Sequence, residues 1–262
     1  MPSHNVALIT GASRGIGKQL AVDFARRGYD VACLARSTAA SPSKLPGTVD
    51  ETVELVRQQG RRAFGLGCDL QSEEQLNAAV EQTYAEFGRV DVLINNAAIA
   101  IPGPTLPQPL RKWRLAVEIN INAPLALMKA VCPRMAAGGG GRVINMSSVA
   151  AVTPEFGRAS YTVTKVALES LTQCLAYELA PTVAVNAVRI DVPIWTEGFV
   201  FTLPGMDTSD FEDPVIMTDV CDWLCRQPLD YTGQIVTIAA LRAQGSVRPR
   251  TRAGDRRADR GA

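Results

Sequence analysis

Short apolar segments alternate with amphipathic segments along the chain. Continuous apolar runs indicate strands, and they lie at 6–10, 31–35, 62–70, 90–96, 142–148, 183–190 and 233–239. The segments between them have helical periodicity. These predicted helices lie at about Ile16–Arg27, Val49–Gln59, Ser72–Phe87, Lys112–Ala136 and Pro214–Arg226, with a further long helix that contains Tyr161. Short apolar strands separated by helices are typical of a parallel sheet covered on both faces.

This alternation predicts one α/β domain with a Rossmann-type, doubly wound parallel sheet of about seven strands. In such sheets, ligands bind at the carboxyl ends of the strands. We expect the domain to span residues 1–243. The remaining segment, 244–262, is rich in arginine and almost without apolar residues, which predicts a disordered tail.

Two internal segments interrupt the alternation. Ser37–Gly47 is a loop rich in proline and serine after the second strand. Glu197–Asp213 is a longer loop after the sixth strand, with the apolar residues Phe199, Phe201, Leu203, Met206 and Phe211. These residues suit a flexible lid over a substrate. Packing, or an interface, explains them equally well.

The composition excludes several classes of function. A formal net charge of +1 gives no global field for nucleic acid, although the basic tail leaves a tail-mediated nucleic-acid binder as a weaker alternative. No apolar run approaches the roughly 20 residues of a membrane span, and the N-terminus has no secretory pattern. We therefore expect a cytoplasmic protein with neither nucleic acid nor membrane as a partner.

The cysteines and the single histidine, His4, do not predict a metal site. The cysteines lie scattered among apolar neighbours, at Cys33, Cys68, Cys132, Cys174, Cys221 and Cys225. Cys221 and Cys225 can share a helix face, but two thiols without further ligands make a poor site. Buried free thiols are the simpler interpretation.

The first strand runs into the glycine-rich segment TGASRGIG, residues 10–17. Gly11, Gly15 and Gly17 allow a sharp turn and a close approach of the backbone to a pyrophosphate. The following helix offers free N–H groups and the positive end of its dipole. Between the first strand and the first helix of an α/β chain, this loop indicates a dinucleotide site.

The end of the second strand favours NADP(H) over NAD(H). Sites specific for NAD place a carboxylate there, whereas this chain has Ala35 and Arg36. Arg14 lies in the glycine loop, and two guanidinium groups suit a 2′-phosphate. Ser37 and Thr38 can add hydroxyl contacts. Two ordinary surface arginines are the alternative interpretation.

Tyr161 and Lys165 stand four residues apart in a predicted helix, so they share one face. A phenol ionises near pH ~10, and a neighbouring cation favours its charged form. The pair is therefore a candidate proton donor near neutral pH. Taken alone, the pair is better explained as a tyrosine and a lysine that face solvent. The other motifs of the chain decide between this interpretation and a catalytic pair.

Together these motifs resemble the short-chain dehydrogenase/reductase family over about residues 5–240. TGASRGIG resembles its cofactor loop, NNAA (95–98) its NNAG motif and Tyr161 with Lys165 its YxxxK pair, while Ser148 lies thirteen residues before Tyr161 as the family pattern expects. The cofactor-binding residues implied by the resemblance and the loop are Gly11, Ser13, Arg14, Gly15, Ile16, Gly17, Arg36, Ser37, Asp69, Leu70, Asn96, Ala97, Tyr161, Lys165 and Thr196.

The resemblance also implies a mechanism with four catalytic residues. Tyr161 exchanges a proton with the substrate oxygen as hydride moves to or from the nicotinamide. Lys165 lowers the pKa of that tyrosine and holds the ribose hydroxyls, and Ser148 positions the substrate oxygen. Asn120 holds a water that relays protons to Lys165. Alternatively, Ser148 is a capping serine and Asn120 satisfies buried backbone groups.

Two departures from the family pattern stand out. Ala98 replaces a glycine, and after the sixth strand Ile190 and Asp191 occupy the places of a Pro-Gly pair. Asp191 is either a turn residue or a neighbour of the cofactor's carboxamide. Thr196 lies one residue later than the family threonine, and Trp195 is expected near the substrate. This altered loop is the basis of a second hypothesis, a dinucleotide-binding sensor without turnover.

The leading hypothesis is an NADP(H)-dependent oxidoreductase that interconverts a small-molecule carbonyl and a secondary alcohol with an apolar body. LPGTVDETVELVRQQG and the altered loop are similar to the hydroxysteroid dehydrogenase-like subgroup, whose substrates are poorly defined. Two helices carry apolar residues on more than one face, including Leu125, Leu127, Met128, Val131, Val166, Leu168, Leu171 and Leu175. A second apolar face predicts a homodimer or homotetramer.

Overall fold

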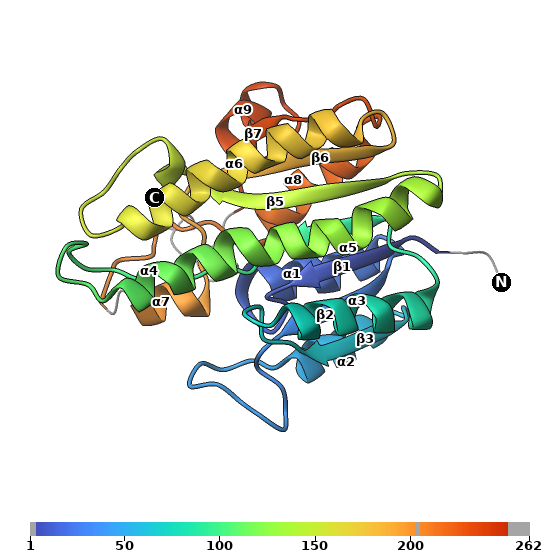
Figure 1. Cartoon of the computed structure of the whole chain (residues 1–262), viewed down its shortest axis with the longest axis horizontal. Helices are drawn as coiled ribbons and strands as arrows, with labels where there is room; N and C mark the ends of the chain where they lie inside the picture. The colour runs from blue at the N-terminus through green and yellow to red at the C-terminus, as the bar shows by residue number, and fades with distance from the viewer. Residues whose placement is uncertain (1–3, 203–204, 251–262) are drawn as a thin grey trace, which may run out of the picture.

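A parallel sheet forms the centre of the molecule (Figure 1). The computed structural model describes residues 4–202 and 205–250. Within them the sheet has 7 strands in the order β3-β2-β1-β4-β5-β6-β7. They are β1 (Val6–Thr10), β2 (Asp30–Ala35), β3 (Ala63–Gly67), β4 (Val92–Asn95), β5 (Gly141–Ser148), β6 (Val183–Ile190) and β7 (Ile235–Thr237). The predicted doubly wound α/β fold is confirmed.

The strand order reverses between β1 and β4, which pair in parallel with Leu8 opposite Leu93. The chain moves outward from β1 through β2 to β3, returns to β4 on the other side of β1, and then moves outward again to β7. Loops that follow β1 and β4 therefore diverge to opposite faces of the sheet. A crevice opens at such a switch point.

Helices cover both faces of the sheet, and the strands β1, β2 and β4 are buried along their whole length. One core cluster packs α1 (Gly15–Arg26), α2 (Val49–Arg57) and α8 (Val215–Arg226) on one face. The other packs α3 (Glu73–Phe87), α5 (Ala123–Ala137) and α6 (Ala159–Leu179) on the opposite face. Ser72 caps α3 as the sequence predicts, accepting from the N–H of Gln75 at 3.2 Å.

The predicted helix at Lys112–Ala136 is a composite of α4 (Leu110–Val117), a π-helical turn η1 (Glu118–Asn122) and α5. Together they form one helix of 28 residues, Leu110–Ala137, which is long and apolar enough to cross a membrane by length and composition alone. Half of its most apolar window is buried inside the protein, as in the core helix of a soluble domain.

The C-terminal part differs from the sequence prediction. The strand expected to reach 239 ends at Thr237, because Thr237 caps α9 (Ile238–Ala243) by accepting from the N–H of Ala240 at 3.1 Å. Val247 is buried in the core, and the N–H of Asp213 donates to the carbonyl of Arg250 at 2.9 Å. Residues 244–250 therefore pack on the domain, whereas 251–262 of the predicted tail lie outside the described residues.

The segment 197–213 contains a short helix, α7 (Glu197–Thr202), which the sequence did not predict. The rings of Phe199 and Phe211 meet edge to face, 5.0 Å between centroids, and Phe211 is buried. Phe201 and Met206 are exposed, and Leu203 lies outside the described residues. Packing thus accounts for Phe199 and Phe211, whereas Phe201 and Met206 expose apolar surface that a substrate or an interface can use.

Candidate active site

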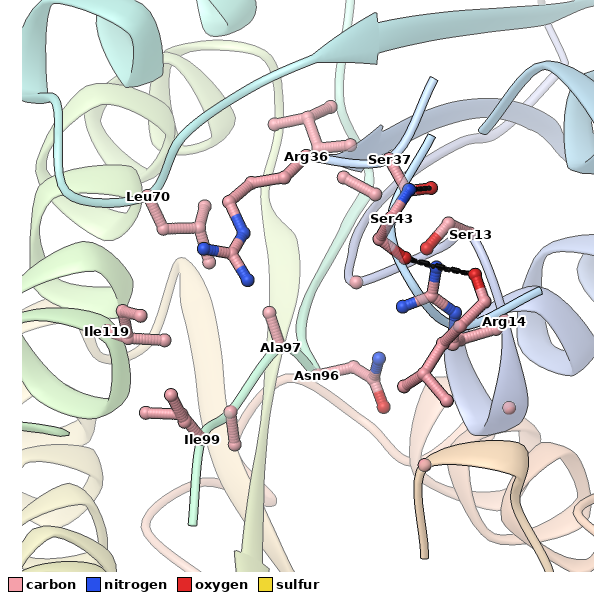
Figure 2. A pocket seen from close by; sticks show the side chains of 18 of the residues that line it. Ser13, Arg14, Arg36, Ser37, Ser43, Leu70, Asn96, Ala97, Ile99 and Ile119 are labelled. Atoms are coloured by element: carbon pink, nitrogen blue, oxygen red, sulfur yellow. Dashed lines mark hydrogen bonds between the residues drawn. The ribbon is translucent and has the colours of Figure 1, made fainter. Parts of the chain in front are cut away.

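A cavity of about 380 Å³ opens at the switch point between β1 and β4 (Figure 2). It lies at the carboxyl ends of the strands, where the fold predicts a ligand. Apart from Tyr161 and Lys165, every cofactor-binding residue predicted from the sequence lines it, namely Gly11, Ser13, Arg14, Gly15, Ile16, Gly17, Arg36, Ser37, Asp69, Leu70, Asn96, Ala97 and Thr196.

The glycines of the loop pack closely against their neighbours, Gly11 and Gly17 against Asn96 and Gly15 against Thr196. Gly11 and Gly15 have φ of +68° and +55°, which disfavour any side chain. A Cβ on Gly17 would lie 2.3 Å from the carbonyl oxygen of Gly11 and 2.6 Å from Asn96 Nδ2. That Nδ2 donates to the carbonyl of Thr10 at 2.8 Å and so ties the end of β4 to the loop. The cradle fits a pyrophosphate.

Arg14 is held by the loop 37–47 as well as lining the cavity. Its Nε donates to the carbonyl of Pro46 at 2.8 Å, and its Nη2 donates to Ser43 Oγ at 2.6 Å and to the carbonyl of Gly47 at 3.0 Å (Figure 2). Burial lowers the pKa of Arg14, whereas the charge of Glu197 raises it. These hydrogen bonds from Arg14 to the loop 37–47 were not predicted from the sequence, although the proline-rich composition of the loop marked it as unusual.

Arg36 is the more available cation. It is exposed at the end of β2, and its side chain extends across the cavity toward Leu70 (Figure 2). Asp69 lines the same end of the cavity and accepts from the N–H of Gln71 at 3.1 Å. Ser43 and Leu45 also line the cavity, with Ser43 beside Arg14 (Figure 2), and neither was predicted from the sequence.

The start of α7 closes the cavity from the opposite side. Thr196 caps this helix by accepting from the N–H of Phe199 at 3.1 Å, and its side chain packs against Gly15. Next to it, Glu197 Oε2 accepts from the N–H of Gly15 at 3.0 Å. A carboxylate therefore lies at the N-terminal end of α1, where the helix dipole favours an anion.

Tyr161, Lys165 and Ser148 come together at the ends of α6 and β5, although they do not line the cavity. Burial raises the pKa of Tyr161, while a hydrogen bond with Ser148 and the charge of Arg158 lower it. Lys165 Nζ lies 5.3 Å from the centroid of the Tyr161 ring and donates to the carbonyl of Met146 at 2.6 Å. Arg158, which the sequence did not single out, is thus a further cation that lowers the pKa of the phenol.

Ser148 has the capping role that the sequence offered as the alternative, and it also bonds Tyr161. It bonds Tyr161, and its Oγ also accepts from the N–H of Ala150 at 3.3 Å at the start of the short 3-10 helix η2 (Val149–Ala151). This cap fixes the direction of the hydroxyl beside the phenol. The serine is held by the turn that follows β5, so no movement of α6 is needed to bring the two hydroxyls together.

Asn120 is buried in the π-helical turn and is fully engaged with protein groups. Its Oδ1 accepts from the N–H of Ile99 at 2.8 Å, and its Nδ2 donates to the carbonyl of Ile99 at 2.9 Å and to Thr164 Oγ1 at 3.0 Å. The side chain therefore satisfies buried backbone, the alternative that the sequence left open. It ties the segment after β4 to α6.

Asp191 explains the altered loop after β6. Its Oδ1 accepts from the N–H of Ile238 at 3.0 Å, and its Oδ2 accepts from the N–H of Ala239 at 3.2 Å. The carboxylate caps the N-terminus of α9. Asp191 is therefore the turn residue of the two alternatives, with a structural role at the start of this helix. The loop consequently gives no support to a binding-only sensor.

Comparisons with known proteins agree with this geometry. A family model described as short chain dehydrogenase matches residues 5–193. Hydroxysteroid dehydrogenase-like protein 2 of Danio rerio is 32% identical over 231 residues, covering 87% of this chain and 55% of that protein. The 3-oxoacyl-acyl-carrier-protein reductase of Staphylococcus aureus is 30% identical over 234 residues, covering 89% and 87%. The chain thus spans about half the length of the first of these relatives.

Solved structures show the same fold. A protein from Xanthomonas campestris has a TM-score of 0.83 at 31% identity, covering 93% of this chain and 90% of that one. A 7α-hydroxysteroid dehydrogenase complexed with NADH and 7-oxo glycochenodeoxycholic acid has a TM-score of 0.79 at 28% identity, covering 89% and 92%.

Proposed function

This chain belongs to the short-chain dehydrogenase family, and on that premise we propose that it is an NADP(H)-dependent oxidoreductase that interconverts a carbonyl and a secondary alcohol. The observation that carries the proposal is the half-buried phenol of Tyr161, which bonds Ser148 and lies beside Lys165 near a glycine-lined cavity. These groups combine a proton donor, a hydroxyl that orients it and a cation.

Tyr161 is the general acid and base. In reduction its hydroxyl gives a proton to the carbonyl oxygen, and in oxidation the phenolate takes it back. Ser148 supports this step because its hydrogen bond stabilises the phenolate. When bound, the nicotinamide cofactor supplies or accepts the hydride.

Lys165 and the glycine loop hold the reacting parts in place. Lys165 is fixed by the carbonyl of Met146, which directs the ammonium next to the phenol. Gly11, Gly15 and Gly17 keep side chains out of the cradle that receives the pyrophosphate. Pre-formed positions of this kind account for much of the rate enhancement of enzymes.

The choice of NADP(H) over NAD(H) rests on Arg36. The end of β2 carries this arginine where NAD-specific sites have a carboxylate, and the side chain reaches into the cavity. Ser37 is buried beside it and donates to the carbonyl of Gly47 at 3.0 Å, so it supports the loop. NAD(H) is the competing cofactor, because the 7α-hydroxysteroid dehydrogenase was solved with NADH.

We further propose an apolar small-molecule substrate, a cytoplasmic location and a homo-oligomer. Phe201 and Met206 expose apolar surface beyond the cavity, which supports the substrate class. Val163 and Val166 expose apolar surface on α6 and support a subunit contact there. Leu127, Met128, Val131 and Leu168 are buried in the core instead, so the proposed contact is smaller than the sequence pattern predicts.

The test is oxidation of NADPH, with NADH in parallel, against ketones, aldehydes, quinones and steroid-like carbonyls. We expect turnover with NADPH and a loss of at least about a hundredfold in Tyr161→Phe, since general acid catalysis contributes roughly 10²–10⁴-fold. Tyr177→Phe, an exposed tyrosine of the same helix, is the control. Faster turnover with NADH overturns the cofactor assignment, and unchanged turnover in Tyr161→Phe overturns the mechanism.

A further inference from the structure

A carboxylate lies one helical turn beyond the active-site lysine. Lys165 and Glu169 are four residues apart on α6, and both are buried, with exposed fractions of 3% and 8%. Residues at this spacing share a helix face. Among the described residues, the ammonium makes one hydrogen bond, to the uncharged carbonyl of Met146. Glu169 is therefore the nearby group that can compensate its charge.

Glu169 is clamped from two strands. Ser147 on β5 donates to Oε1 at 2.7 Å. Arg189 on β6 donates from Nε to Oε1 at 2.9 Å and from Nη2 to Oε2 at 2.6 Å. These three hydrogen bonds from two strands hold the buried carboxylate in one position. The forked contact with the guanidinium also prevents the carboxylate from swinging over to Lys165.

The charges around Lys165 act in opposite directions. Burial lowers its pKa to about 8, and the charge of Glu169 raises it. Among the described residues, the charged side chains on the elements packed against α6 are Arg142 on β5, Arg189 on β6, Glu118 on η1, and Arg111, Lys112 and Arg114 on α4. Of these, only Arg189 bonds Glu169. Glu118 bonds Asn122 instead, and Arg142 bonds the carbonyl of Gln227.

We propose that Glu169, clamped by Ser147 and Arg189, is a positioning residue that keeps the buried Lys165 cationic at neutral pH. The inference rests on the proposed function, in which Lys165 acts as the cation beside Tyr161. Arg189 moderates the effect, because its positive charge faces the same carboxylate. Through Arg189 and Glu169, β6 thereby affects the charge of Lys165, although neither residue contacts substrate or cofactor in this proposal.

The test follows the titration of Lys165 directly and does not depend on turnover. The lysines of the chain are Lys18, Lys44, Lys112, Lys129 and Lys165, so ¹³Cε-labelled lysine gives few signals, and Lys165→Arg assigns the one of interest. In the unmodified protein we expect a midpoint near pH 8, as burial dictates. In Glu169→Gln the midpoint falls by roughly 0.5 to 1 unit, because a nearby opposite charge has been removed.

Further variants separate charge from structure. Arg189→Gln removes the positive charge that faces Glu169, so the midpoint rises. Arg189→Lys keeps the charge and leaves the midpoint close to that of the parent. Glu178→Gln replaces an exposed carboxylate on the same helix and is the matched control. Thermal unfolding of each variant identifies any that fail to fold.

The outcomes distinguish this inference from the proposed function. A midpoint that falls in Glu169→Gln and rises in Arg189→Gln supports the positioning role, whether or not a substrate has been found. An unchanged midpoint in a folded Glu169→Gln protein overturns it, even if the enzyme reduces carbonyls. Where turnover is measurable, we expect the pH profile of kcat in each variant to shift in the same direction as the titration midpoint of Lys165.

Discussion

Glu197 Oε2 accepts a hydrogen bond of 3.0 Å from the backbone N–H of Gly15, in the loop that cradles the pyrophosphate in our proposal. The two residues are 182 positions apart in the sequence. The carboxylate occupies the favourable anion position at the N-terminus of α1. A dinucleotide that uses the same N–H groups must displace it or bind beside its negative charge.

We therefore predict that Glu197→Gln binds NADPH roughly 2- to 5-fold more tightly, since a charge at a helix terminus contributes about 0.3–1 kcal/mol and each 1.4 kcal/mol is a factor of ten. Calorimetric titration measures the affinity. Asp207→Asn, an exposed carboxylate of the same segment, is the control. Weaker binding in Glu197→Gln would mean that the carboxylate helps to hold the cofactor.

Arg36 and Arg14 are predicted to have different roles in cofactor choice. Arg36→Ala should lower the affinity for NADPH about 10- to 100-fold and leave that for NADH almost unchanged, because hydrogen bonds to charged groups contribute about 1.5–3 kcal/mol. Arg14→Ala should weaken both cofactors, because Arg14 holds the loop 37–47 in place. Dissociation constants for both cofactors decide this, with Arg111→Ala as an exposed control. An equal loss in Arg36→Ala contradicts the 2′-phosphate contact.

Arg158 is predicted to tune the proton donor. Its charge lowers the pKa of Tyr161, against the larger effect of burial, which raises it. Arg158→Met removes the favourable charge, so the folded-state pKa of the phenol rises further. Alcohol oxidation needs the phenolate, and the ascending limb of its pH profile should therefore move to higher pH. A limb that stays in place would show that solvent or the bound cofactor screens Arg158.

Asp191 is predicted to stabilise the domain without contributing to cofactor binding. Asp191→Ala removes the carboxylate that caps α9, and losing such a cap costs about 0.5–2 kcal/mol. Denaturant unfolding should show this loss, and Asp191→Asn should retain most of the stability because asparagine also caps helices. Calorimetry should give the same NADPH affinity in all three proteins. A loss of affinity in the folded Asp191→Ala variant would place the loop at the cofactor instead.

The sequence was sufficient wherever local spacing carries the information. Apolar periodicity located the strands to within a few residues, and the order of strands and helices required the parallel sheet. The glycine loop and the pair Tyr161 and Lys165 were predicted from a strand end and from one helix face, whereas Ser148 was implied by the family resemblance. The strand expected at 233–239 was too long because Thr237 and Asp191 together start a helix there, and periodicity alone does not detect such caps.

By itself, the sequence determined the fold class and the position of the glycine loop, because these depend on residues close together in the chain. The catalytic set stays a prediction from the family resemblance. Only the tertiary structure decided which charges meet. It brought Glu197 to Gly15, Arg14 to the loop 37–47 and Arg189 to Glu169. The physical reason is that these contacts join segments remote in sequence at one edge or face of the sheet. Their partners depend on the path of each loop and on burial, which no local pattern encodes.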